Sequence, residues 1–210
     1  MNAIIDADAA ARAGWGVLDL ASACLDGGAT FLQLRAKNAS SRWLLETAET
    51  IVALGERHGA RLIVNDRADV ARLAQATGVH VGQDDLAPGA VRRIVGPTQI
   101  IGLSTHTPAQ IEAAVREPID YLAVGPVFGS ASKATGYDAV GLEMVTLAAD
   151  RARARGLSLV AIGGITLERA ADVIRAGADS VAVIGDLVAS GDPRARVREY
   201  LERLGSEGRV

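Results

Sequence analysis

The segment Gln33-Leu34-Arg35-Ala36-Lys37 alternates polar and apolar residues. It directly follows a short run of β-branched and apolar residues, 30–32. The segment would end a strand with three polar side chains at alternating positions, and two of them are cationic. A guanidinium and an ammonium group so close together suit a clamp on a polyanion such as a diphosphate. The alternative is a solvated strand end, and the spacing alone leaves both interpretations open.

Two carboxylates follow the next two apolar runs. Asn65-Asp66 comes after residues 62–64, and Asp85 comes shortly after residues 79–82. Magnesium takes one or two carboxylates and leaves its other positions to water and phosphate oxygens, so Asp66 and Asp85 predict a Mg²⁺-diphosphate site beside the clamp. Alternatively, each carboxylate caps the helix that follows it.

A long segment of small residues, 125–136, supplies Ser130, Ser132 and Lys133. Hydroxyl groups and an ammonium group can bind phosphate oxygens, and the glycines of the segment allow the backbone changes that a lid needs. A plain connection is the alternative. Loops of this length are uncommon in compact domains unless they have a function, which favours the lid.

Glycines also end the last two apolar runs. Gly163-Gly164 and Ile184-Gly185 would present bare backbone amides in neighbouring loops, where a phosphate could bind. Ser104 ends another apolar run, close to His106. His58 and His80 have neither metal-ligand spacing nor a nucleophile beside them, so we expect both to be structural, and no serine or cysteine lies in a nucleophile-elbow pattern.

Short apolar segments and amphipathic segments alternate along the whole chain, which is typical of stacked βα units with a parallel sheet. The expected strands are Ala3–Asp6, Thr30–Arg35, Leu62–Asp66, Val79–Gly82, Ile100–Ser104, Tyr121–Gly125, Leu159–Gly163 and Val181–Gly185, the first being the weakest. Expected helices include 40–58, 67–75 and 167–176, and we expect Gly59, Gly78, Gly156 and Gly177 at helix C-caps.

The polar residues named above lie at the carboxyl ends of these strands. In a closed barrel such ends meet at one mouth, where the active site of that fold lies, whereas an open sheet would scatter them along an edge. The sequence therefore favours an α/β fold with a single (β/α)8 TIM barrel over residues 1–210 as one domain.

The composition excludes several functional classes. The chain has 210 residues with a net charge of −3 and 49% hydrophobic residues, so a disordered protein is excluded. No basic excess and only 3% aromatic residues argue against a nucleic-acid partner. The single cysteine, Cys24, fits a reducing compartment. With no signal-peptide pattern and no long apolar run, we expect a cytoplasmic protein without membrane partners. A homo-oligomer is compatible with the sequence but is not indicated by it.

Seven motifs, in order along the chain, resemble the thiamine phosphate synthase family. They are Gln33-Leu34-Arg35-x-Lys37, Val64-Asn65-Asp66-Arg67, residues 78–85, Gly102-Leu103-Ser104-Thr105-His106, residues 125–133, Ala161-Ile162-Gly163-Gly164-Ile165 and Val181-Ala182-Val183-Ile184. Each is short, but together they cover nearly the whole chain.

The resemblance implies a (β/α)8 barrel that joins hydroxymethylpyrimidine diphosphate to hydroxyethylthiazole phosphate, giving thiamine phosphate and diphosphate by a dissociative displacement. It implies Mg²⁺ as the cofactor and small molecules as the partners. By the same resemblance, the pyrimidine diphosphate is held by Gln33, Arg35, Lys37, Asn65, Ser104 and Lys133, magnesium by Asp66 and Asp85, and the thiazole phosphate by Ser130, Ser132, Gly164, Ile184 and Gly185. The resemblance also implies that Arg35, Lys37 and Lys133 are the catalytic residues.

The chain departs from the family pattern at several of these positions. Gly185 stands where the family usually has a serine, which leaves only a backbone amide for the phosphate. The lid keeps both hydroxyl groups but lacks the usual proline, and Ala36 replaces a common glutamate. Two alternatives to a synthase therefore stay open: a thiazole tautomerase paralogue on the same barrel, and a non-catalytic phosphate-binding barrel of the thiamine pathway.

Overall fold

Strands and helices alternate in the computed structural model, which describes residues 1–129 and 137–207. The strands are β1 (Asn2–Asp6), β2 (Phe31–Arg35), β3 (Arg61–Asn65), β4 (Gly78–Val81), β5 (Ile100–Thr105), β6 (Tyr121–Val124), β7 (Ser158–Ile162) and β8 (Ser180–Val183). The helices are α1 (Ala7–Arg12), α2 (Val17–Asp26), α3 (Ser41–Glu56), α4 (Ala68–Leu73), α5 (Pro88–Val95), α6 (Pro108–Ala114), α7 (Gly141–Arg153), α8 (Leu167–Arg175), α9 (Gly185–Ala189) and α10 (Pro193–Glu207).

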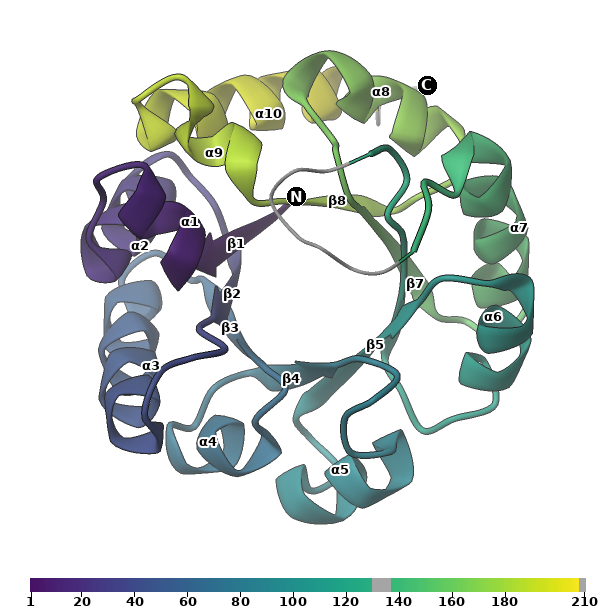
Figure 1. Cartoon of the computed structure of the whole chain (residues 1–210), viewed down its shortest axis with the longest axis horizontal. Helices are drawn as coiled ribbons and strands as arrows, with labels where there is room; N and C mark the ends of the chain where they lie inside the picture. The colour runs from purple at the N-terminus through teal and green to yellow at the C-terminus, as the bar shows by residue number, and fades with distance from the viewer. Residues whose placement is uncertain (130–136, 208–210) are drawn as a thin grey trace.

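The strands pair in chain order, all in parallel, and form a closed barrel. The barrel closes where β1 pairs with β8, through Asn2 opposite Ala182 and Ala3 opposite Val183. Figure 1 looks down the barrel and shows the helices around the outside of the ring of strands. The predicted (β/α)8 TIM barrel is confirmed.

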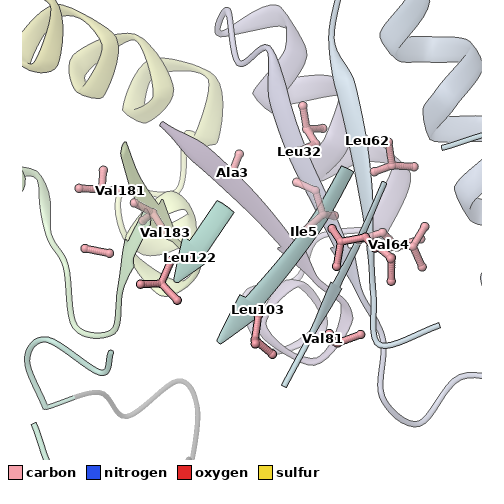
Figure 2. Packing of buried hydrophobic residues seen from close by; sticks show 14 of the residues in the cluster. Ala3, Ile5, Leu32, Leu62, Val64, Val81, Leu103, Leu122, Val181 and Val183 are labelled. Atoms are coloured by element: carbon pink, nitrogen blue, oxygen red, sulfur yellow. The ribbon is translucent and has the colours of Figure 1, made fainter. Parts of the chain in front are cut away.

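Alternate residues of each strand face two different layers. Ala3 and Ile5 belong to the large cluster of buried residues between strands and helices, whereas Ile4 packs inside the barrel with Tyr121 and Val160. Figure 2 shows part of the outer cluster, including Leu32, Leu62, Val64, Leu103, Leu122 and Val181. A fully buried leucine side chain stabilises the fold by about 1.5–3 kcal/mol, so this outer layer supplies much of the driving force for folding.

The predicted elements agree with the structure to within a residue or two at most ends. The first strand, expected to be weak, is fully paired on one side with β2 over Ala3–Asp6. Helix α3 is capped by Ser40, whose hydroxyl oxygen accepts a hydrogen bond from the Trp43 amide at 3.2 Å. No helix in the described ranges is long and apolar enough to cross a membrane.

One glycine prediction is wrong. Gly59, Gly156 and Gly177 have the positive φ of a helix C-cap, but Gly78 opens β4 instead. A Cβ atom at residue 78 would lie 2.1 Å from the Ile100 carbonyl oxygen, so the glycine is needed for close strand pairing. The left-handed position after α4 is taken by Gln75, with φ of 53°.

Candidate functional site

One cavity lies inside the barrel, and a second lies at the carboxyl ends of strands β5 to β8. We call them the interior cavity, about 20 Å³, and the mouth cavity, about 260 Å³. The interior cavity is polar on one side, with Asn2, Gln33, Arg35, Asn65, His80 and Ser104, and apolar on the other, with Ala123, Val160, Ile162, Ala182 and Ile184. Ser104 lines both cavities, so the two share a wall.

Arg35 is held by a buried carboxylate that its sequence context does not reveal. The Arg35 guanidinium forms an ion pair with Asp6, which is only 2% exposed. Asp6 also accepts a hydrogen bond from the Ala9 amide at 2.8 Å and so caps α1. Because Asp6 ends β1 and Arg35 ends β2, parallel pairing places the two side by side. The pair fixes the guanidinium within the wall of the interior cavity.

Lys37, Asp66 and Asp85 form a second charged group, which we call the rim trio. The Lys37 ammonium lies 3.4 Å from the Asp66 carboxylate. Burial raises the pKa of Asp66, a hydrogen bond and charge repulsion from Asp85 raise it further, and Lys37 opposes them. The structure thus brings the two predicted magnesium ligands together. The rim trio lines neither of the two cavities, and Asn65, which precedes Asp66 in the chain, lines the interior one.

Neither carboxylate of the rim trio caps a helix. Asp66 has a left-handed backbone, with φ of 64°, and the N-cap of α4 is Arg67, without a side-chain hydrogen bond. Asp85 accepts a hydrogen bond from the Gly82 amide at 2.8 Å, within its own turn, while Ala87 precedes α5. The alternative explanation of these acids as helix caps is therefore wrong.

His80 connects the interior to Ser104. Its Nδ1 lies 2.8 Å from the Tyr121 hydroxyl group, and its Nε2 lies 2.8 Å from the Ser104 hydroxyl group. The side-chain amide of Gln83 donates a hydrogen bond to the backbone carbonyl oxygen of Ser104 at 2.7 Å. Burial raises the pKa of Tyr121, which keeps its hydroxyl group protonated. His80 thus holds the side chain of Ser104, which lines both cavities, and this contact fits its predicted structural role.

The mouth cavity has a wall of backbone. Gly164 has φ of 61°, and a Cβ there would lie 2.5 Å from the Gly129 carbonyl oxygen, so a side chain would collide with the neighbouring loop. Gly163, Gly164, Ile184 and Gly185 line the cavity, as expected for the loops after β7 and β8. Exposed amides in such loops are a common phosphate site of this fold.

An aromatic pair lies beside this cavity. His106, which lines it, stacks on Tyr137 with ring centroids 4.0 Å apart. Its Nδ1 lies 2.5 Å from the Gly125 carbonyl oxygen. The lid residues Ser130, Ser132 and Lys133 lie outside the described residues.

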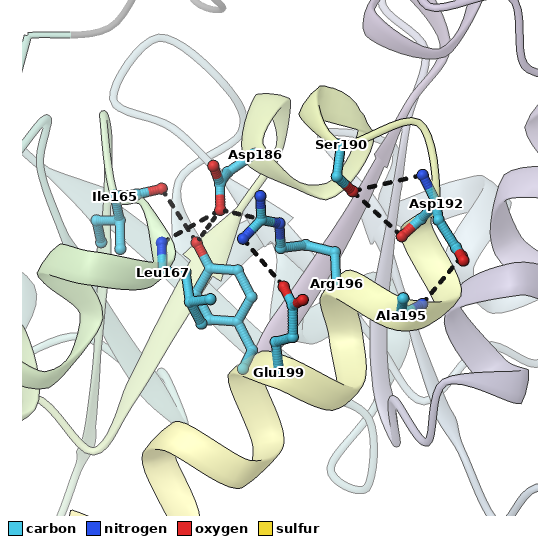
Figure 3. A network of polar contacts seen from close by, with 9 residues as sticks. Ile165, Leu167, Asp186, Ser190, Asp192, Ala195, Arg196 and Glu199 are labelled. Atoms are coloured by element: carbon cyan, nitrogen blue, oxygen red, sulfur yellow. Dashed lines mark hydrogen bonds and ion pairs between the residues drawn. The ribbon is translucent and has the colours of Figure 1, made fainter.

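A polar network fixes the far side of the mouth cavity (Figure 3). Asp186, which lines the cavity, accepts hydrogen bonds from the Tyr200 hydroxyl group at 2.7 Å and from the Leu167 amide at 3.2 Å. Arg196 lies 3.8 Å from the same carboxylate and 3.0 Å from Glu199. This network joins α8, α9 and α10 behind the glycine loops.

The structure sorts the predicted residues into three groups. Gln33, Arg35, Asn65, Ser104 and Ile184 line the interior cavity; Ser104, Gly164, Ile184 and Gly185 line the mouth cavity; Lys37, Asp66 and Asp85 form the rim trio. Asp6, Tyr121, Arg169 and Asp186 were not predicted as site residues. Only Asp6 has a position in the sequence that could have indicated a role, because it ends the first strand just as Asp66 follows the third.

Known proteins are similar to this chain in sequence and in fold. A family model described as thiamine monophosphate synthase matches residues 2–187. A thiamine-phosphate synthase from Koribacter versatilis is 49% identical in an alignment of 185 residues, with 86% of this chain and 82% of the relative covered. One from Roseiflexus castenholzii is 43% identical over 182 residues, covering 87% of this chain and 78% of the relative.

A solved structure agrees with these sequence matches. The thiamine phosphate pyrophosphorylase from Pyrococcus furiosus is similar with a TM-score of 0.85 and 30% identity, covering 98% of this chain and 95% of that one. The family model spans most of the chain, and both relatives exceed two fifths identity over most of their length. The chain belongs to the thiamine monophosphate synthase family.

Proposed function

We propose that the protein is a thiamine phosphate synthase, a transferase that joins hydroxymethylpyrimidine diphosphate to hydroxyethylthiazole phosphate. The observation that carries the proposal is that one barrel mouth holds two separate groups of residues, each suited to binding an anion. Arg35 and the rim trio lie at β2 to β4, and the glycine-walled mouth cavity lies across the barrel at β7 and β8. A reaction between a diphosphate and a monophosphate needs two such sites with a shared wall, and Ser104 belongs to that wall.

The proposed displacement is dissociative. The bond between the pyrimidine methylene carbon and the diphosphate oxygen breaks, and its electron pair leaves with the diphosphate. The lone pair of the thiazole nitrogen then forms the new carbon–nitrogen bond. Such a step depends on neutralising the leaving group and on excluding water from the cation, and it needs little acid–base catalysis.

The side chains of the barrel suit those two requirements. Arg35 and Lys37, which pair with Asp6 and Asp66, would donate charge-assisted hydrogen bonds to the diphosphate. On the opposite wall of the interior cavity, Ala123, Val160 and Ala182 present hydrocarbon, which would keep water from the cation. Gln33 and Asn65 would orient the polar edge of the pyrimidine through hydrogen bonds.

Magnesium fits the rim trio. Asp66 and Asp85 provide oxygen ligands, the kind that magnesium prefers, and their mutual repulsion favours a bound cation between them. Within the described part of the chain, no group of three or more His, Cys, Asp or Glu could hold a metal. Water and diphosphate oxygens would therefore complete the coordination. When bound, magnesium would neutralise charge that accumulates on the leaving diphosphate.

The experiment that tests the function supplies the purified protein with both substrates, with and without magnesium. Diphosphate release and the mass of thiamine phosphate are measured together. We expect product only when both substrates and the metal are present. Binding of the thiazole phosphate without any coupled product would instead support the tautomerase or the non-catalytic barrel.

We also propose a cytoplasmic location and a single domain over residues 1–210. The lone Cys24, buried in the outer cluster, fits a reducing compartment. The pairing of β1 with β8 makes the described strands one closed sheet, which supports a single domain.

A further inference from the structure

Arg169 brings a positive charge to the mouth cavity. It is the third residue of α8, and it is the one lysine or arginine among the described residues that line this cavity. Arg169 is exposed on an amphipathic helix, and its spacing in the sequence is that of an ordinary surface residue. The cavity lining also includes Gly163, Gly164 and Gly185, and Arg169 contacts Gly164 directly.

Two contacts hold the guanidinium group over the glycine wall. It lies 4.8 Å from the centroid of the Phe128 ring, and its Nη1 donates a hydrogen bond to the Gly164 carbonyl oxygen at 3.2 Å. Stacking uses the face of the guanidinium plane, and the hydrogen bond uses one of its several N–H groups. The remaining N–H groups stay available to a ligand in the cavity.

The acidic residue in the same lining does not neutralise Arg169. The Asp186 carboxylate accepts hydrogen bonds from Tyr200 and from the Leu167 amide, and the guanidinium of Arg196 lies 3.8 Å away. Its charge is therefore balanced from the α10 side. What faces the glycine amides is a cation, and amides together with a guanidinium group favour an anion with several oxygens.

We propose that Arg169 is a specificity-determining residue that binds the phosphate group of the thiazole substrate. Gly185 has no side chain and can supply only a backbone amide, and Arg169 would supply charge-assisted hydrogen bonds to the same phosphate. This inference rests on the proposed function, because it takes the mouth cavity as the monophosphate site. It adds that the cavity selects the monophosphate ester over the free thiazole alcohol through this side chain.

Calorimetric titration of hydroxyethylthiazole phosphate and of the unphosphorylated thiazole tests the proposal. Wild type is compared with Arg169→Gln, Arg169→Lys and Arg175→Gln. Arg175 is a matched control, because it lies on the same helix and pairs with Asp172, away from the lining of the cavity. Arg169→Gln should weaken binding of the phosphate about tenfold, because hydrogen bonds to charged groups contribute at least that factor. Arg169→Lys should recover part of the loss.

Binding of the unphosphorylated thiazole should be the same in all four proteins, and Arg175→Gln should bind the phosphate like wild type. Equal affinities of wild type and Arg169→Gln for the phosphate would overturn the proposal, as would equal losses for the phosphate and the alcohol. If wild type binds the phosphate through Arg169 but forms no product, the proposed synthase activity fails while the inference about Arg169 stands. If wild type does not bind the phosphate at all, both fail.

Discussion

The Tyr200 hydroxyl group donates a hydrogen bond to the Asp186 carboxylate across 2.7 Å, which connects the last helix of the barrel to a wall of the mouth cavity. Tyr200 is fully buried, and the same carboxylate oxygen accepts the amide of Leu167. Burial and the Asp186 contact raise the pKa of Tyr200, so it remains a donor at any physiological pH. Helix α10 therefore positions the loops after β7 and β8.

Replacing Tyr200 by phenylalanine removes that hydrogen bond and keeps the ring. We expect the free energy of unfolding to fall by about 1–2 kcal/mol, because a charged acceptor loses a buried donor. The KM for the thiazole phosphate should rise several-fold while kcat stays near wild type, since Asp186 keeps its other partners. Urea unfolding and steady-state kinetics measure both effects. Glu202→Gln, an exposed change on the same helix, is the control, and a Tyr200→Phe variant indistinguishable from it would contradict the positioning role.

Asp85→Asn tests the magnesium site without removing the turn. An asparagine oxygen can still accept the hydrogen bond from the Gly82 amide, so the fold should persist. Turnover that depends on magnesium should fall about 100-fold or more, since an amide is a poorer ligand for a hard cation. Asp84→Asn makes the same change at the exposed neighbouring residue and should keep wild-type turnover. Equal turnover in the two variants, measured by diphosphate release over a magnesium series, would exclude Asp85 as a ligand.

Lys37→Ala separates the two halves of the site. Lys37 lies beside Asp66 in the rim trio, across the barrel from the glycine loops. We expect about tenfold weaker binding of the pyrimidine diphosphate and unchanged binding of the thiazole phosphate, as the two titrations would show. Arg57→Ala, at the exposed C-terminal end of α3, removes one positive charge elsewhere and should change neither affinity. Equal losses for both ligands in Lys37→Ala would contradict the division of the mouth.

The buried Cys24 thiol makes the free energy of unfolding depend on pH in the alkaline range. Burial raises the pKa of the Cys24 thiol from its ordinary value of 9.0 to about 12. Between those values the unfolded chain loses a proton that the folded protein keeps, so the free energy of unfolding falls as the pH rises, by at most about 1.4 kcal/mol per pH unit. Urea unfolding at pH 8, 9 and 10 should show a smaller decline in Cys24→Ala than in wild type. Parallel declines would mean that the thiol does not contribute.

The barrel could be predicted because its signals are local. Each apolar run carries its own turn and helix signals, and the polar residues at the strand ends indicated a closed mouth. Gly78 shows the limit of that approach, because a glycine after a helix serves equally well as a C-cap or as the start of a crowded strand. Only the proximity of the Ile100 carbonyl decides between them.

The charged site was predicted only in part, for a related reason. Lys37, Asp66 and Asp85 follow strands and have the residue types that bind a metal diphosphate. Pairing partners such as Asp6 for Arg35, or Tyr121 for His80, depend on which strands are neighbours and on which residues face inward. Arg169 lies on a helix whose pattern explains it fully as a surface residue. Its position at the cavity depends on the path of the β7 loop.

Closing the sheet by pairing β1 with β8 also has a consequence for synthesis on the ribosome. Residues 2 and 3 are synthesised long before residues 182 and 183, with which they pair in the closed barrel. Until those partners have been made, β1 can pair with β2 along one backbone edge, while its other edge stays unpaired. Its inward-facing residues Asn2 and Ile4, which line the interior cavity, also lack their neighbours on β8. The nascent chain therefore carries an open sheet edge until β8 has been made, and at this stage chaperone contact would matter most.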